Sequence, residues 1–255
     1  MQVVVITGGG TGIGLASVRY FARRNAQVVI IGRRGVVLNE AVQAVRREFP
    51  GAPNVLAYKG DLGASAQVEA ICNDLGERFR VVDILVNAAG GHVLRQHSAE
   101  RYADGLAGVA RRWTDNFHNN TLSAVLLTEG LMPRLRSPDG RIIFISSMAA
   151  YRGSGVGCYG GAKAALHPYC FDLARTLGPK GITVNVIAPG YVADTEFFGR
   201  AMTADLHSAR IAETMNHRAG APIDVANTIG WLASPEAAHV TAQVIQVNGG
   251  AERGR

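Results

Sequence analysis

Residues 3–14 read VVVITGGGTGIG, an apolar run of four residues followed by a glycine-rich turn. A short, wholly apolar run next to a turn is typical of a strand that is buried on both faces. The amphipathic pattern that follows continues to Arg24 and predicts a helix. Glycines let the backbone of such a turn approach a pyrophosphate, and the helix N-terminus adds free N–H groups and partial positive charge. The stretch therefore predicts an anion-binding turn between a strand and a helix.

The rest of the chain repeats this alternation of short β-branched runs and helix-length stretches. Strands are expected at Val3–Ile6, Gln27–Ile31, Val55–Tyr58, Asp83–Val86, Arg141–Ile145, Thr183–Ile187 and Val244–Val247. Apolar strands that are each followed by a helix predict a parallel sheet covered on both faces. The predicted fold is α/β: a doubly wound, Rossmann-type parallel sheet of about seven strands. With no internal repeat or linker, residues 1–255 are interpreted as one domain, with a mobile excursion on the substrate side around residues 191–218.

Composition narrows the classes of partner and location. The net charge is +6, but the arginines occur in scattered pairs without interleaved aromatic residues, so a nucleic-acid partner is not expected. No segment has the length of a membrane span, and the N-terminus resembles a buried strand rather than a signal peptide. Three cysteines without metal-ligand spacing indicate a reducing compartment, hence a cytoplasmic location, and no metal site.

The glycine spacing carries a family resemblance. TGGGTGIG resembles the TGxxxGIG turn of short-chain dehydrogenases/reductases, and Asn87-Ala88-Ala89-Gly90, after the fourth expected strand, resembles their NNAG motif. The resemblance extends from Val3 to Gly250 and favours the single-domain branch similar to 3-oxoacyl-carrier-protein reductases. It implies cofactor contacts along the glycine turn, a floor beneath the cofactor, and an adenine side; these are assigned to Gly8, Gly10, Thr11, Gly12, Ile13 and Gly14, to Asn87, Ala88 and Gly90, and to Asp61 and Leu62. Alternatively, Asn87 only caps its strand.

The end of the second strand bears on the choice of cofactor. An NAD enzyme usually places Asp or Glu there to bind the ribose hydroxyls, whereas this chain has Gly32 followed by Arg33 and Arg34. Two guanidinium groups with no carboxylate beside them favour a 2'-phosphate. The expected cofactor is therefore NADP, with NAD less favoured. Arg34 has the alternative interpretation that it only begins a solvated helix.

Tyr159 and Lys163 form the strongest local signal of chemistry. Residues four apart share a helix face, so we expect the Lys163 ammonium beside the Tyr159 phenol, where a cation favours the phenolate and lowers the phenol pKa. By resemblance, a serine at the end of the fifth strand binds the substrate oxygen. The alignment selects Ser147; Ser146 remains the alternative because it gives the expected spacing to the tyrosine.

The resemblance supplies two further groups of residues. An asparagine seven residues after Trp113 selects Asn120, whose family role is a helix distortion that supports a proton relay, while Asn116 and Asn119 are expected on the surface. The stretch after the sixth strand resembles the family's N-x-x-x-PG-x-x-x-T pattern. It implies nicotinamide contacts from Pro189, Gly190, Val192 and Thr195.

These residues together predict hydride transfer between NADPH and a ketone or secondary alcohol. The alternatives are an NAD-dependent alcohol dehydrogenase on the same scaffold, or a dinucleotide-binding sensor without turnover. Tyr191, Phe197 and Phe198 indicate an apolar or aromatic small-molecule substrate, such as an acyl thioester. Family habit implies a homotetramer or a dimer. Pro168, five residues beyond the lysine, predicts a kink in the helix that usually packs between subunits.

Overall fold

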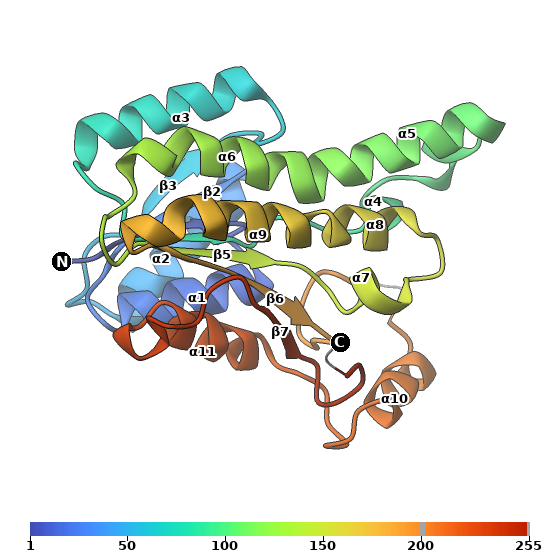
Figure 1. The fold of residues 1–255 in the computed structure, drawn as a ribbon. Helices are drawn as coiled ribbons and strands as arrows, with labels where there is room; N and C mark the ends of the chain where they lie inside the picture. The colour runs from blue at the N-terminus through green and yellow to red at the C-terminus, as the bar shows by residue number, and fades with distance from the viewer. Residues whose placement is uncertain (199–201, 254–255) are drawn as a thin grey trace.

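A computed structural model describes residues 1–198 and 202–253, and its centre is a seven-stranded parallel sheet (Figure 1). The strands lie in the order β3-β2-β1-β4-β5-β6-β7. Their bounds are β1 (Val3–Thr7), β2 (Gln27–Gly32), β3 (Leu56–Lys59), β4 (Ile84–Asn87), β5 (Arg141–Ile145), β6 (Thr183–Pro189) and β7 (Val244–Val247). All seven expected strands are present, each within two residues of its predicted ends, so the doubly wound fold is confirmed.

Helices cover both faces of the sheet. One layer holds α1 (Gly12–Ala22), α2 (Gly35–Glu48) and α11 (Pro222–Leu232). The other holds α3 (Ser65–Arg78), α6 (Ser123–Leu131) and α9 (Leu166–Leu177). The remaining helices flank the carboxyl edge of the sheet: α4 (Val93–Gln96), α5 (Gly105–Phe117), α7 (Ala149–Arg152), α8 (Cys158–Ala164) and α10 (Ala204–Ala212). In Figure 1, α5 and α10 project from the body at this end.

Strand alternation divides the core into two halves. Val3 and Val5 pack with α3, α6 and α9, whereas Val4 and Ile6 pack with α1, α2 and α11. Successive side chains of a strand point to opposite faces, so an apolar run such as that of β1 fills both halves. Every residue of β1, β5 and β6 is buried. The strands that carry the site at their carboxyl ends are therefore packed on both faces.

The kink expected near Pro168 is present. The helix containing Tyr159 is interrupted at Ala165, between α8 and α9, one turn before Pro168. Proline has no N–H to donate to the carbonyl four residues earlier, which is the physical reason for the break. The residues between α4 and Trp113 form a 3₁₀ helix (Ala99–Tyr102) and the first turns of α5. The excursion around residues 191–218 contains α10; its residues 199–201 lie outside the described residues, and its mobility and the one-domain interpretation stay predictions.

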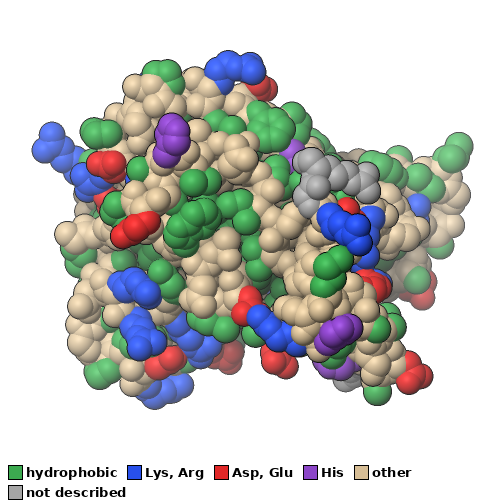
Figure 2. All heavy atoms as spheres, turned by 60° about the horizontal axis from the view of Figure 1, so that its bottom comes forward, with side chains coloured by type: hydrophobic (Ala, Val, Ile, Leu, Met, Phe, Trp, Pro, Cys, Tyr) green, Lys and Arg blue, Asp and Glu red, His purple; other side chains and the backbone are tan. Residues whose placement is uncertain are grey.

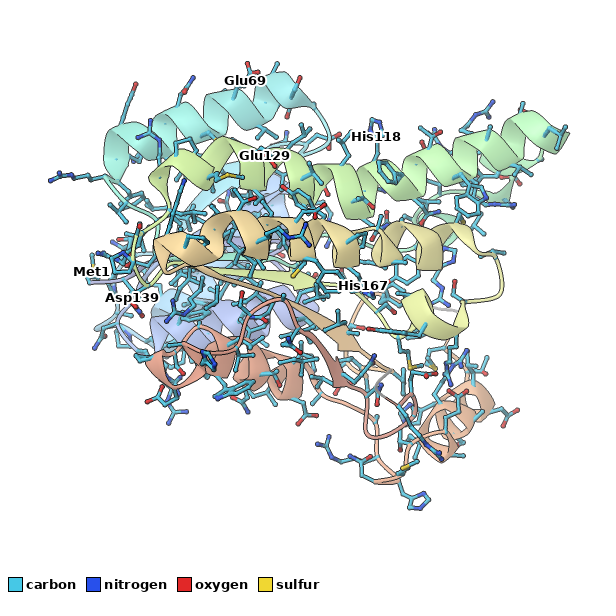
Figure 3. All side chains as sticks on the ribbon, in the orientation of Figure 1. Met1, Glu69, His118, Glu129, Asp139 and His167 are labelled. Carbon is cyan, nitrogen blue, oxygen red and sulfur yellow. The ribbon has the colours of Figure 1, made fainter. Side chains whose placement is uncertain are left out.

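Charge is mixed on the face that Figure 2 shows. This view turns the lower side of Figure 1 toward the reader. Lys and Arg side chains lie interspersed with Asp and Glu side chains on it. In Figure 3, His118, which lies between α5 and α6, points away from the sheet. Within residues 1–198 and 202–253, no helix is long and apolar enough to cross a membrane.

Candidate active site

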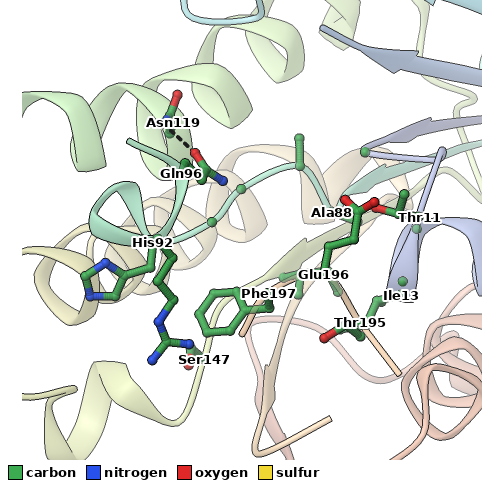
Figure 4. A pocket seen from close by; sticks show the side chains of 18 of the residues that line it. Thr11, Ile13, Ala88, His92, Gln96, Asn119, Ser147, Thr195, Glu196 and Phe197 are labelled. Carbon is green, nitrogen blue, oxygen red and sulfur yellow. Dashed lines mark hydrogen bonds between the residues drawn. The ribbon is translucent and has the colours of Figure 1, made fainter. Parts of the chain in front are cut away.

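A cleft of about 700 Å³ opens at the carboxyl edge of the sheet, where the strand order reverses between β1 and β4. Ligands of doubly wound folds bind at this topological switch point. The cleft is lined by the glycine turn after β1, the loop after β4, the end of β5 and the loop after β6. In Figure 4, Thr11 and Ile13 lie at one end of it, and His92 and Ser147 at the other, with Phe197 between them. The two ends are called here the cofactor end and the substrate end.

Close packing explains the glycines of the turn. Gly8 has a φ of +68°, and a Cβ there would lie 3.0 Å from the Ala89 Cα. A Cβ on Gly14 would lie 2.1 Å from the Gly8 carbonyl oxygen. The Ala89 N–H donates to the Thr7 hydroxyl at 2.8 Å, which ties the loop after β4 to β1. Helix α1 begins here without a side-chain cap, so its first N–H groups remain available for a phosphate.

The two arginines after β2 lie at the cofactor end of the cleft, and Gly32 lines it without a side chain. The Arg34 guanidinium forms an ion pair with Glu196 at 2.6 Å, and Arg33 donates to the Asn119 side chain at 3.3 Å. Asn119 in turn donates to Gln96, as the dashed line in Figure 4 marks. Arg34 therefore faces the cleft, but a carboxylate of the loop after β6 already contacts it.

Most of the residues assigned to the cofactor line the cleft: Gly8, Gly10, Thr11, Gly12, Ile13, Gly14, Arg33, Arg34, Asp61, Leu62, Ala88, Gly90, Pro189, Gly190, Val192 and Thr195. Asn87 does not. Its side chain is buried behind the wall and donates to the Thr128 hydroxyl at 3.0 Å. The Asn87 carboxamide thus ties the end of β4 to α6.

Tyr159, Lys163 and Ser147 converge at the substrate end. All three line the cleft, and Ser147 hydrogen-bonds to the Tyr159 phenol. Ser146 turns the other way: its hydroxyl is buried and donates to the Lys163 carbonyl at 3.0 Å, and it contacts His167 Nε2 at 2.9 Å. His167 lies on α9 (Figure 3). The arrangement selects Ser147, rather than Ser146, as the serine beside the phenol.

The electrostatic prediction for Tyr159 is wrong in sign. Burial raises the pKa of the phenol to about 12, and the two influences that lower it are the hydrogen bond from Ser147 and the charge of Arg95. Burial also lowers the pKa of Lys163 to about 7. The lysine amine donates to the Ile145 carbonyl at 2.7 Å. A deeply buried site disfavours both charged forms, so the neutral phenol holds its proton at pH 7.

Asn120 lies in a π-helical turn (His118–Leu122) between α5 and α6, as expected for a distorted helix. Its carboxamide accepts from the Gly91 N–H and donates to the Gly91 carbonyl, both at 2.9 Å, so it lies behind the cleft wall. A Cβ on Gly90 would lie 2.6 Å from the Asn120 Oδ1 and 2.9 Å from the Lys163 amine. Only glycine therefore fits between the asparagine and the lysine.

The surface assignment for Asn116 is also wrong. This side chain is fully buried and donates to the Arg112 carbonyl at 2.9 Å and to the Cys158 thiol at 3.2 Å. Asn119 is partly buried and lines the cleft. Asn116 and Asn119 are three residues apart, so both lie on the inner side of the helix. The motif that selected Asn120 by its distance from Trp113 does not take this helix face into account.

Three residues surround the phenol, and of these the sequence placed only Phe197 on the substrate side; it assigned no role to His92 or Arg95. The His92 ring stacks on the Tyr159 ring with centroids 5.3 Å apart, and the Phe197 ring lies 5.4 Å from it on a tilted plane. The Arg95 guanidinium lies 4.8 Å from the Phe197 centroid. These residues come from the loop and helix after β4 and from the loop after β6, and no motif links them. Only the fold brings them together.

Comparison with known proteins agrees with this geometry. A family model described as enoyl-(acyl carrier protein) reductase matches residues 8–252. The 3-oxoacyl-(acyl-carrier-protein) reductase FabG of Escherichia coli strain K12 is 32% identical over 251 residues, which cover 98% of this chain and 96% of that protein. The 3alpha-hydroxysteroid dehydrogenase of Mediterraneibacter gnavus is 32% identical over 253 residues, with the same coverage. An NADPH-bound short chain oxidoreductase from Pseudomonas aeruginosa PAO1, described as containing an atypical catalytic center, superimposes with a TM-score of 0.85 at 29% identity. The match covers 100% of this chain and 98% of that one.

Proposed function

The chain belongs to the short-chain dehydrogenase/reductase family of oxidoreductases, and on that premise we propose that it is an NADP(H)-dependent ketoreductase. The observation that carries the proposal is the convergence of Ser147, Tyr159 and Lys163 at one end of a cleft whose other end is a glycine turn. A binding protein without turnover has no need for a buried phenol that hydrogen-bonds a serine at that place.

NADPH fits the other end of the cleft. The uncapped start of α1 would hold the pyrophosphate, and Arg33 and Arg34 would hold the 2'-phosphate. Gly32 leaves room there and brings no carboxylate to repel that phosphate. The Pseudomonas relative, whose structure is NADPH-bound, supports the same choice of cofactor. When bound, the nicotinamide supplies the hydride that the carbonyl carbon receives.

The protein's own residues then handle the carbonyl oxygen. Ser147 donates a hydrogen bond that orients it, and Tyr159 gives it the phenolic proton. The raised pKa of Tyr159 keeps that proton available at pH 7. Lys163 would hold the ribose hydroxyls beside the phenol, and Asn120 holds the Gly90-Gly91 backbone against the lysine. The names of the relatives favour a 3-oxoacyl thioester or a steroid-like ketone as the substrate class.

The experiment is NADPH oxidation by wild type, Tyr159→Phe and Tyr151→Phe with an acetoacetyl thioester and an aromatic ketone. Loss of the phenolic proton donor should lower kcat at least about 100-fold. The NADPH dissociation constant should change less than about twofold, because the ring remains. Tyr151 lies on α7 and does not line the cleft, so Tyr151→Phe is the matched control. Equal turnover by Tyr159→Phe and wild type contradicts the proposal, as does tight cofactor binding without any turnover.

We also propose that the chain forms homo-oligomers. Helix α5 exposes Leu106, Val109, Trp113 and Phe117, whose spacing of three and four residues places them on one face. An exposed apolar stripe of this length is typical of an interface.

A further inference from the structure

The substrate end of the cleft carries an excess of positive charge that ketone reduction alone does not use. Arg95 on α4, Arg152 on α7 and Arg210 on α10 all line it. Glu213 forms an ion pair with Arg152, and a second one with Arg210 at 2.8 Å. One carboxylate is thus shared by two guanidinium groups, and the third, Arg95, has no ion pair or hydrogen bond from its side chain in residues 1–198 and 202–253.

Among the described residues, Arg95 contacts aromatic rings and no acidic side chain. Its guanidinium lies 4.2 Å from the Phe198 centroid and 4.8 Å from the Phe197 centroid. Stacking of this kind fixes the plane of a guanidinium while leaving its N–H groups free to bind a planar anion at two points. The charge of Arg95 also acts on Tyr159, and that of Arg210 acts on Arg95. The Arg95 guanidinium therefore lies within electrostatic reach of the reacting end of the cleft.

A second polar group without a partner lies beside the phenol. The His92 side chain lines the cleft and is only 5% exposed, and its Nδ1 has no hydrogen-bond partner in the described chain. Burial and the charges of Arg95 and Arg112 lower the pKa of His92 to about 4, so the ring is neutral at pH 7. Buried polar atoms in native proteins are nearly always paired. An unpaired nitrogen at this place indicates a ligand group that completes it.

Resting on the proposed ketone reduction, we propose that this site takes ketones that carry an anionic group, a carboxylate or a phosphate, bound by Arg95 and His92. The anion accepts hydrogen bonds from the guanidinium and from the imidazole N–H. It is not consumed: the hydride still adds to the carbonyl carbon and the Tyr159 proton to the oxygen. Phe197 and Phe198 then pack against the carbon chain between the two polar ends.

The test measures binding without turnover. Tyr159→Phe saturated with NADPH is titrated calorimetrically with acetoacetate and methyl acetoacetate, and with dihydroxyacetone phosphate and dihydroxyacetone. Each pair differs mainly in the charge of one group, so the two pairs separate a carboxylate from a phosphate. We expect the charged member of at least one pair to bind at least tenfold more tightly than its neutral partner. Arg95→Met, added to this background, should abolish the difference.

Arg24→Met is the matched control, because Arg24 also stacks on an aromatic ring, 3.6 Å from the Tyr20 centroid, but does not line the cleft. It should keep the preference for the anion. Equal binding of charged and neutral members overturns the inference, as does an equal loss of both in Arg95→Met, which indicates a merely structural arginine. Binding of no compound in either pair also overturns it. If the anion binds but wild type oxidises no NADPH with any of these ketones, with the acetoacetyl thioester or with the aromatic ketone, the proposed reduction fails and the anion site stands.

Discussion

Replacing the buried Lys163 by methionine should remove a pH dependence from the stability of the cofactor-free protein. The lysine side chain is 3% exposed, and burial lowers its pKa from 10.5 to about 7. The folded pKa lies below the unfolded one, so between the two values the unfolded chain binds more protons than the folded chain. Stability contributed by this group therefore rises as the pH rises through that window.

The magnitude follows from these two pKa values. Between pH 7 and pH 9 the free energy of unfolding should rise by about 2 kcal/mol through this group alone. The window lies above the titration of His92, whose pKa is about 4, and below the ordinary value of 10 for Tyr159. Methionine fills a similar volume without an ionisable group, so Lys163→Met should be more stable than wild type at pH 7 by a margin that shrinks toward pH 9.

Urea unfolding followed by circular dichroism at pH 7, 8 and 9 measures this. Lys180→Met serves as the control, because Lys180 is exposed in the 3₁₀ turn after α9. It should retain the wild-type rise in the unfolding free energy. If Lys163→Met and wild type change in parallel across the three pH values, the lysine is not buried as a neutral amine and the reasoning fails.

Three further substitutions test the cleft and the surface. Gly90→Ala places a Cβ 2.6 Å from the Asn120 Oδ1 and should lower the free energy of unfolding by about 1–3 kcal/mol; urea unfolding equal to wild type would contradict the close packing. Glu196→Gln removes the acid that contacts Arg34, an exposed pair worth up to about 1 kcal/mol, so the NADPH dissociation constant should fall about two- to fivefold while that of NADH stays the same. A cofactor fluorescence titration measures both constants, and equal changes would refute competition with the 2'-phosphate. Trp113→Glu charges the exposed stripe of α5 and should reduce the particle mass in light scattering, whereas an unaltered mass would place the interface elsewhere.

Local sequence patterns predicted most of the fold, because most of the interactions that shape its helices, strands and turns are between residues near one another in the chain. Apolar runs of strand length, glycines where Gly8 and Gly14 allow no Cβ, and a proline that breaks a helix all act on neighbours in the chain. The same holds for Tyr159 and Lys163, which share a helix face four residues apart. Strand ends, by contrast, shifted by one or two residues, since tertiary packing decides where pairing stops.

The sequence by itself determined the parallel sheet and the glycine turn. It also determined which helical segments carry Tyr159, Lys163 and Asn120. Only the tertiary structure decided that Ser147 rather than Ser146 faces the phenol, that Glu196 reaches Arg34 across 162 positions of sequence, and that Arg95 and His92 lie beside Tyr159. It also decided the sign of the phenol's pKa shift. Burial and long-range contacts depend on which segments the fold brings together. The spacing of residues along the chain predicts neither the burial of a group nor its long-range contacts.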